Sequence, residues 1–137
     1  MGADAASLPV AGDLAPGKRM SSNMCPLVVI NKSGRLAAAA GSAGASRIRT
    51  ALVDTLVALI VDELDMPAAI ARPRFHVVGD TVHAEPGVPE DELAALADAG
   101  WQINRWPEID HYFGGVTGVG AGGAAGDPRR GGAGLLL

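Results

Sequence analysis

Apolar and polar residues form two kinds of pattern in the first half of the chain. Two apolar runs, 26–30 and 35–40, flank the polar turn 31–34 and predict a β-hairpin. Neither run alternates, so we expect both faces of this hairpin to be covered. From residue 47, apolar residues recur every three or four positions as far as Leu64, which predicts a largely buried helix of about five turns. We expect Ser46 to cap that helix, because its hydroxyl can accept a hydrogen bond from a free N–H of the first turn.

The second half of the chain predicts shorter elements. A Gly-Asp pair at 79–80 separates two short runs and is typical of a tight hairpin. A proline begins each of two short helices, and Pro73 ends the first while Gly100 ends the second. The predicted elements are helices at 67–71 and 89–99 and strands at 75–78, 81–84, 101–106 and 112–119. The resulting order, ββ-α-α-ββ-α-β-β, predicts a layered α/β (α+β) domain with antiparallel hairpins.

Composition limits the size of the core and the kinds of partner. The chain has 137 residues, enough for one domain, but only two Phe, two Trp and one Tyr. We therefore expect a thin core that a partner would complete. The net charge is −4 and no basic stripe is present, which argues against nucleic acid as a partner. The longest apolar stretch, 51–61, is too short to span a membrane. Residues 1–7 do not resemble a secretory signal, and the compartment stays open.

Two segments of small and polar residues could bind an anion. Residues 41–46 lie between a predicted strand and a predicted helix, where backbone N–H groups are unpaired and can bind an anion or a developing oxyanion. An ordinary tight turn is the commoner role of such a segment. Residues 21–26 form a polar loop whose Ser and Asn side chains can donate hydrogen bonds to a carboxylate. Taken alone, this loop is only a polar connection.

Other candidate chemistry in the sequence is better explained structurally. Cys25 has no nearby histidine to activate it and is expected to be a small apolar filler; as the single cysteine it excludes an internal disulfide. His76 and His83 could face each other across a hairpin, but no acidic residue completes a metal site. Residues 118–123 match the letters of the dinucleotide motif GxGxxG, but no helix follows them. We therefore expect neither a cofactor nor a metal ion.

The succession of these motifs resembles the small subunit of γ-glutamyltransferases. That family reads G-K-R, then S-S-M-S-P, then G-S-P-G-G-S-R-I, then A-P-R-F-H, V-E-P-G and D-P-R-R-G-G. The corresponding segments here are 17–19, 22–26, 41–48, 71–76, 82–87 and 127–132. The resemblance covers residues 16–132, which leaves an irregular lead-in at 1–15 and a tail at 133–137. The chain is thus similar to the C-terminal part of that subunit.

The resemblance implies part of an N-terminal-nucleophile hydrolase fold, an αββα sandwich, and roles for four residues. Ser22 matches the first serine of the pair that binds the α-carboxylate of the glutamyl group, and Asn23 stands at the second. Gly44 and Ala45 match the glycine pair whose backbone N–H groups bind the oxyanion. If the second glycine position requires a positive φ, Ala45 is strained there.

The resemblance also implies a nucleophile that the sequence does not contain. The family attacks the γ-glutamyl carbonyl with the N-terminal Thr of a T-T-H motif upstream of the serine pair, using the α-amine as its base. None of the 21 residues before Ser22 is Thr. The chain alone is therefore expected to be inactive and to need the large subunit and the start of the small subunit as partners, with a γ-glutamyl substrate such as glutathione. A related acylase and a non-catalytic remnant or binding module are the alternatives.

Overall fold

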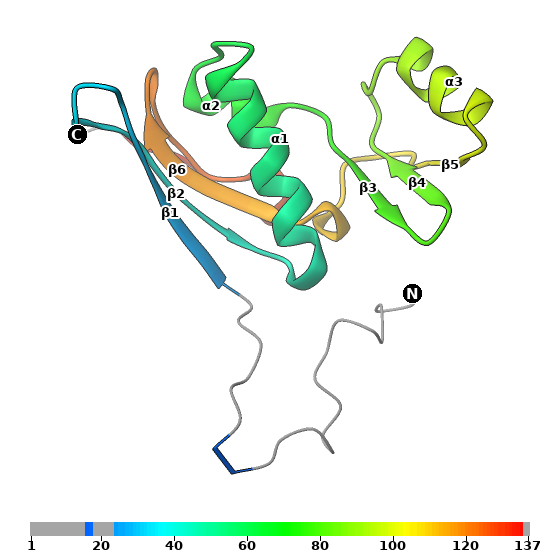
Figure 1. Ribbon diagram of the computed structural model, residues 1–137, viewed down its shortest axis with the longest axis horizontal. Helices are drawn as coiled ribbons and strands as arrows, with labels where there is room; N and C mark the ends of the chain where they lie inside the picture. Colours follow the sequence, from blue (N-terminus) through cyan, green and yellow to red (C-terminus); the bar gives the residue numbers. More distant parts are fainter. Residues whose placement is uncertain (1–15, 18–23, 136–137) are drawn as a thin grey trace.

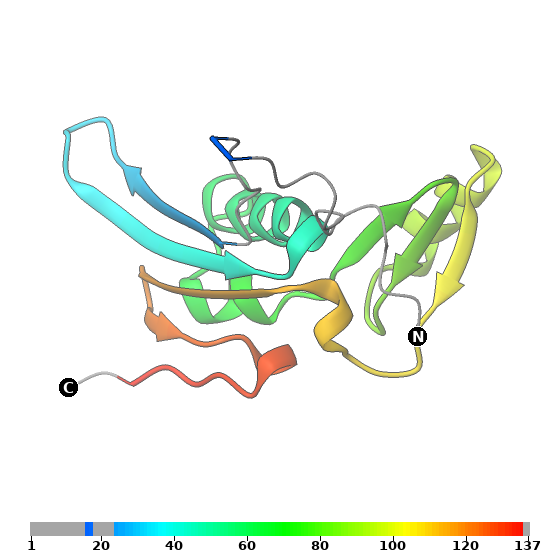
Figure 2. The ribbon, with the colours of Figure 1, turned by 90° about the horizontal axis from the view of Figure 1, so that it is seen from below.

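The computed structural model describes residues 16–17 and 24–135, which form two sheets with helices beside them (Figures 1 and 2). In chain order the elements are β1 (Met24–Ile30), β2 (Leu36–Ala43), the 3₁₀ turn η2 (Ala45–Arg47), α1 (Ile48–Ile60), α2 (Met66–Ala71), β3 (Phe75–Val78), β4 (Thr81–Ala84), α3 (Glu90–Asp98), β5 (Gln102–Arg105), η3 (His111–Phe113), β6 (Gly115–Gly120), β7 (Gly123–Ala125) and η4 (Pro128–Arg130). The predicted mixed α+β class is therefore confirmed. No helix of the described part of the chain is long and apolar enough to cross a membrane.

The larger sheet has the strand order β1-β2-β6-β7, and every neighbouring pair is antiparallel. Helices α1 and α2 lie on one face of this sheet, as Figure 1 shows. Apolar side chains from the helices and from that face form the main core, which comprises Ala38, Ile48, Ala51, Leu52, Met66, Ile70 and Val116. The core is thin, as the small number of large apolar residues predicts, since it contains no aromatic side chain.

The smaller sheet has the order β3-β4-β5 and lies beside the first (Figure 2). Strands β3 and β4 form the hairpin predicted from the Gly-Asp pair, with the predicted bounds. Strand β5 joins β4 in parallel, because α3 carries the chain back along the sheet before β5 begins. Buried Leu93 of α3 packs on Ala84 and Val88 to form a second, smaller core.

Two expectations about the first half of the chain were wrong. Helix α1 has 13 residues and ends at Ile60, short of the five turns that the apolar spacing predicted. Ser46 does not cap it, because residues 45–47 form a 3₁₀ turn and Arg47 occupies the N-cap position without a side-chain cap bond. The Ser46 hydroxyl instead accepts a hydrogen bond of 2.6 Å from the Arg47 guanidinium.

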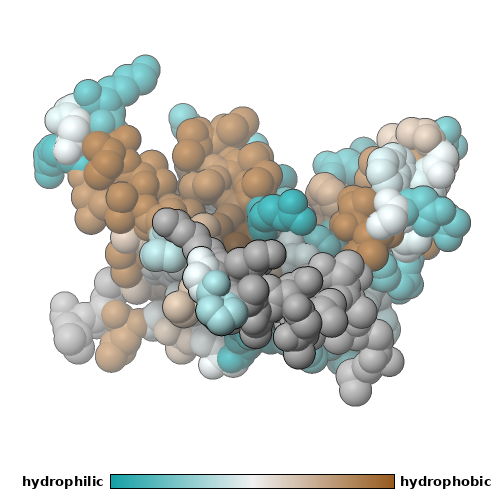
Figure 3. All heavy atoms as spheres, turned by 60° about the horizontal axis from the view of Figure 1, so that its bottom comes forward, coloured by the Kyte–Doolittle hydropathy of each residue, from teal (hydrophilic) through white to brown (hydrophobic). Residues whose placement is uncertain are grey.

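The β1–β2 hairpin also differs from the prediction, because its second face is open. Side chains of β1 alternate between exposed and half-buried positions, and Val28 is 64% exposed. Its neighbours across the sheet are Ala39 and Val119, so apolar residues continue over three strands. Val53 and Ile60 of α1 are also more than half exposed. Figure 3 shows these apolar surfaces in brown, over the hairpin and over the central helices.

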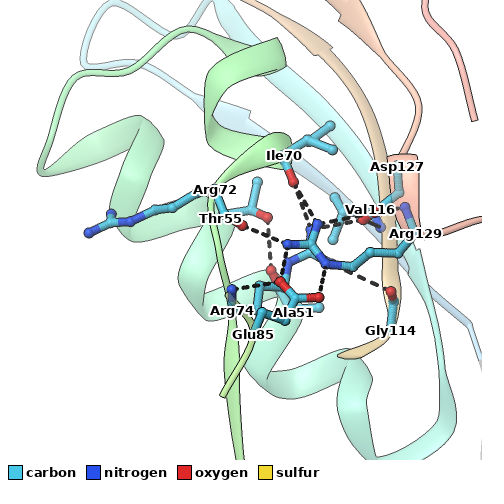
Figure 4. Close-up of polar contacts among 10 residues, drawn as sticks. All are labelled: Ala51, Thr55, Ile70, Arg72, Arg74, Glu85, Gly114, Val116, Asp127 and Arg129. Carbon is cyan, nitrogen blue, oxygen red and sulfur yellow. Dashed lines mark hydrogen bonds and ion pairs between the residues drawn. The ribbon is translucent and has the colours of Figure 1, made fainter. Parts of the chain in front are cut away.

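A buried cluster of charges ties the C-terminal segment to the rest of the fold (Figure 4). Arg129 contacts Glu85 through Nε at 2.6 Å and Asp127 through Nη1 at 3.2 Å. Arg74 contacts Asp127 at 2.8 Å, and its backbone N–H donates to Glu85 at 2.9 Å. The four side chains carry two positive and two negative charges, and all are nearly inaccessible to solvent. The balance of charge and the many hydrogen bonds offset the desolvation that such burial costs.

Candidate functional site

The corner between β2 and α1 has a backbone that few residues can adopt. Gly44 has φ 142° and ψ 25°, and Ala45 has φ 53°. A Cβ at position 44 would lie 2.8 Å from the Cα of Gly114, so only glycine fits there. Ala45 carries a side chain in the left-handed region, which costs about 1–2 kcal/mol. Such strain is often found at functional sites, where the surrounding structure fixes it.

The corner leaves backbone donors available. The carbonyl oxygen of Gly44 accepts from the N–H of Arg47 at 3.0 Å, which closes the 3₁₀ turn. Among residues 24–135, neither the N–H of Gly44 nor that of Ala45 donates a backbone hydrogen bond outside the strand ladder. Two adjacent N–H groups at the start of a helical segment are suited to an anion or an oxyanion.

Aromatic side chains hold the corner from the side of the smaller sheet. The Arg47 guanidinium lies 4.1 Å from the centre of the Tyr112 ring, a cation–π contact. Tyr112 stacks on Trp106 with 4.7 Å between ring centroids and meets Phe113 edge-on. This group precedes Gly114, whose backbone contacts Gly44, so the second sheet supports the geometry of the corner.

His83 is part of this aromatic group, and its protonation state follows from its partners. The Trp106 indole N–H donates to Nδ1 of His83 at 3.2 Å, and the Asn104 amide lies 3.0 Å from the same atom. An indole nitrogen can only donate, so Nδ1 is the acceptor and the proton is on Nε2. Desolvation and the nearby charge of Arg47 lower the pKa of His83. The histidine therefore acts as a fixed acceptor in the packing.

A cavity of about 460 Å³ opens beside the corner, at the end of the larger sheet. Cys25, Ser42 and Gly115 are among the residues that line it, together with Asp127 and Arg130. The Arg130 side chain lies across Gly115, since a Cβ there would clash with Cδ of Arg130. The Ser42 hydroxyl is buried and has no hydrogen-bond partner in the described part of the chain.

The structure brings together only part of the predicted site. Gly44 and Ala45 form the corner between β2 and α1, and Ala45 has the positive φ that would strain it. Ser22 and Asn23 lie outside the described residues. The register of β1 with β2 pairs Met24, which follows Asn23, with Ala43, which precedes Gly44.

The histidines and the glycine-rich segment considered as metal or dinucleotide sites have structural roles instead. His76 and His83 are cross-strand partners, as suspected, but His76 bonds Thr50 through Nδ1 at 2.8 Å. No group of three or more His, Cys, Asp or Glu residues in the described part of the chain could hold a metal ion. Residues 118–123 form the end of β6, a turn and the start of β7, which rules out a helix for a dinucleotide phosphate.

Sequence reasoning did not identify Asp54 or Arg130. Asp54, on α1, has one buried carboxylate oxygen without a partner, and desolvation outweighs nearby arginines and raises its pKa to about 6. The sequence signal for Asp54 was a single acidic residue among the apolar residues of the predicted helix. Arg130 could have been found only through its place in the D-P-R-R-G-G segment, whose other charges are buried in the ionic cluster.

Comparison with known proteins gives a consistent result. A family model described as gamma-glutamyltranspeptidase matches residues 3–137. The glutathione hydrolase proenzyme of Pseudomonas aeruginosa is 32% identical over 93% of this chain, and the acylase ACY 1 proenzyme of Pseudomonas sp. strain V22 is 34% identical over 70%. The chain spans 24% and 17% of those proteins, respectively.

A solved structure has the same fold as this chain. The gamma-glutamyltranspeptidase of Pseudomonas nitroreducens, complexed with L-DON, superimposes with a TM-score of 0.73 at 26% identity. The match covers 93% of this chain and 69% of that one. The two-sheet arrangement described above is therefore part of an N-terminal-nucleophile hydrolase fold, as the sequence motifs implied.

Proposed function

The chain belongs to the gamma-glutamyltranspeptidase family, and we propose that it forms one wall of an active site that hydrolyses or transfers γ-glutamyl groups. In this proposal the reaction passes through an acyl-enzyme on a threonine. Water or an amine then resolves the acyl-enzyme, with glutathione as a representative γ-glutamyl donor. The observation that carries the proposal is the strained corner at Gly44 and Ala45, which presents two adjacent N–H groups beside an open cavity.

Gly44 and Ala45 act as the oxyanion site. When the γ-carbonyl is attacked, its oxygen gains negative charge, and preorganised N–H donors stabilise that charge without having to move. The close approach of the Gly114 backbone restricts position 44 to glycine, because a Cβ there would lie 2.8 Å from the Cα of Gly114. Loss of one donor of this kind costs about 3–4 kcal/mol in a well-studied protease.

Ser22 and Asn23 hold the α-carboxylate of the glutamyl group. The support is the register of the hairpin, which pairs Met24 with Ala43 next to the corner. Asn23 keeps an N–H donor where the family has serine. The carboxylate and the reacting carbonyl of one glutamyl group would thus be held by neighbouring ends of β1 and β2.

The nucleophile comes from polypeptide outside this chain. Its four threonines are Thr50, Thr55, Thr81 and Thr117, and all lie within helices or strands, where none has a free α-amine. The apolar face formed by Val28 and its neighbours needs a cover, which the upstream part of the enzyme supplies. The chain alone is inactive in this proposal.

Reconstitution tests the proposal. The chain is purified alone and together with a polypeptide that carries the large subunit and the T-T-H start of the small subunit. Hydrolysis of a γ-glutamyl anilide is then compared with hydrolysis of a non-glutamyl amide. We expect γ-glutamyl hydrolysis in the mixture only. Activity of the chain alone contradicts the external nucleophile, and inactivity of a correctly assembled mixture supports a non-catalytic remnant or binding module.

A related acylase is the second candidate. The favouring observations are the similarity to an acylase proenzyme and the departures at Asn23 and Ala45, next to the acyl group in the proposed site. Preference of the reconstituted mixture for the non-glutamyl amide would select this function.

A further inference from the structure

We propose that a second cavity, between α1 and the segments around β3 and α3, binds a small organic ammonium ion whose charge pairs with Asp54. Within the described part of the chain, this cavity shares no lining residue with the one beside the corner. Binding there is therefore independent of the proposed function of Gly44 and Ala45. It gives a role to a half-buried acid that the fold leaves without a partner.

The second cavity has the size and the walls of a small-molecule site. Its volume is about 430 Å³. The apolar side chains that line it are Val53, Val57, Pro73, Phe75, Val88 and Pro89. Pockets for small molecules commonly enclose about 300–1,000 Å³ and combine apolar walls with a few polar groups. This cavity therefore suits a small molecule with an apolar body.

Asp54, on α1, is an acid in the lining of this cavity. One of its carboxylate oxygens, Oδ2, is buried and has no hydrogen-bond partner in the described part of the chain. Desolvation raises the pKa of Asp54 to about 6, so the carboxylate is mostly ionised at neutral pH. An ionised carboxylate that is partly removed from water and receives no hydrogen bond is costly. A cation in the cavity would offset part of this cost.

No basic side chain of the described residues serves as the counter-ion of Asp54. The three arginines near it are Arg72, Arg74 and Arg129. Two of them belong to the ionic cluster, where two positive charges already balance two negative charges. The third, Arg72, pairs with Asp62. Because each arginine is held by another carboxylate, their combined effect on Asp54 is smaller than that of desolvation.

The acids around the cavity add to its negative character. Glu92, on α3, is exposed and lines the same cavity. Glu85 is paired with Arg129, yet its charge still opposes the ionisation of Asp54. Arg72 is the basic residue among the lining residues, and Asp62 already holds its charge. The cavity therefore favours a cation over an anion.

An organic cation fits this lining better than a metal ion. A metal ion such as Ca²⁺ needs several oxygen ligands, and no group of three or more His, Cys, Asp or Glu residues among those described could hold one. An ammonium ion can pair with a single carboxylate through charge-assisted N–H bonds. Its hydrocarbon part would gain from burial against the apolar walls.

The test uses the full 137-residue chain labelled with ¹⁵N and two probes, n-butylammonium chloride and 1-butanol. Both probes have the same four-carbon body, and only the first carries a charge. We expect butylammonium to shift the amide signals of Val53, Asp54 and Val88 in a saturable titration at pH 7.5, with a dissociation constant of about 1 mM. The dissociation constant of 1-butanol should be about tenfold higher. Sodium chloride at equal concentration corrects for ionic strength.

Variants and pH identify the carboxylate. Asp54→Asn should remove the preference for butylammonium, and unfolding would not explain that loss, because removal of the uncompensated charge is expected to stabilise the chain. The exposed control Asp98→Asn should leave the preference unchanged. In the wild-type chain the affinity should fall about tenfold from pH 7.5 to pH 5, as Asp54 takes up a proton while the amine stays charged. Glu92→Gln should change the affinity less than about twofold and keep this pH dependence.

Several results would overturn the proposal. Equal affinities for the two probes would show that the cavity does not select charge. A preference that survives Asp54→Asn would place the ammonium ion elsewhere, and the absence of saturable shifts with either probe would leave water as the only partner of Asp54. Tighter binding of Nα-acetyl-lysinamide than of butylammonium would assign the cavity to a lysine of a partner protein. None of these results alters the test of the corner by reconstitution.

Discussion

Two polar regions of this molecule use similar residues and differ in how completely they are satisfied. In the ionic cluster every buried charge meets an opposite charge and several hydrogen bonds. In the cavity beside Gly44, the buried hydroxyl of Ser42 has no hydrogen-bond partner within the described residues. The satisfied region is scaffold, and a ligand is expected in the other region, because a buried hydroxyl without a partner is costly unless something binds it.

The largest effect should come from breaking the satisfied region. Arg129→Met leaves buried Glu85 without its ion-pair partner and Asp127 with Arg74 alone, so we expect a loss of about 3–5 kcal/mol in the free energy of unfolding. Urea denaturation followed by circular dichroism measures it. Arg105→Met removes an exposed pair with Glu90 and should cause no measurable change. Equal effects of the two substitutions would mean that the cluster is not a scaffold.

The next effect tests whether the corner tolerates a side chain. Gly44→Ala places a methyl group 2.8 Å from the backbone of Gly114 at a positive φ, and we expect a loss of about 2–3 kcal/mol. Gly79→Ala is the matched control, because Gly79 also has a positive φ but no neighbour within 4 Å. Its cost should be about 1 kcal/mol. Thermal unfolding of both variants separates the clash from backbone strain.

Asp54 is an intermediate case, a carboxylate near three arginines but without a hydrogen-bond partner for its buried oxygen. Its pKa is raised from 3.8 to about 6, so its ionised form destabilises the fold above pH 6. This destabilisation is lost as the pH falls from about 7 to 4. We expect Asp54→Asn to stabilise the chain by about 1–2 kcal/mol at pH 7.5 and by progressively less toward pH 4.

Urea titrations across that pH range measure the effect of Asp54→Asn, and the exposed Asp98→Asn serves as the control. A gain in stability that does not depend on pH would show that the pKa of Asp54 is not raised in the folded chain.

The smallest effect concerns Ala45. Replacement with glycine relieves a left-handed alanine but adds freedom to the unfolded chain, so we expect a net gain below about 1 kcal/mol. Differential scanning calorimetry measures it. In the reconstituted enzyme the same substitution should preserve or raise γ-glutamyl hydrolysis, since the N–H donor is kept; a large loss would contradict the role of the backbone.

The sequence allowed most helices and strands to be predicted, but it did not predict which faces of them are buried. The β3–β4 hairpin was predicted with correct bounds because Gly79-Asp80 determines its turn locally. Strand β7 was missed because its three residues are glycine and alanine, which give no hydrophobic period. The open face around Val28 was predicted to be buried, since an apolar run does not say which polypeptide covers it.

The candidate site was predictable only in part. Gly44 and Ala45 could be placed at a strand-to-helix corner from the sequence, and the backbone there is as strained as suspected. Arg130 and Asp127 lie more than 80 residues further along the chain, and no local pattern joins them to that corner. Charges in the ionic cluster also look like ordinary surface residues when only their sequence is considered.

The distance along the chain between partners in the ionic cluster affects how the protein can be made. Arg129 is translated 44 residues after its partner Glu85 and 59 residues after Ile70, whose carbonyl it also contacts. A nascent chain that has not yet released Arg129 from the ribosome holds Arg74 and Glu85 without their full set of partners. The ionic cluster is therefore completed only when the segment around Arg129 has emerged.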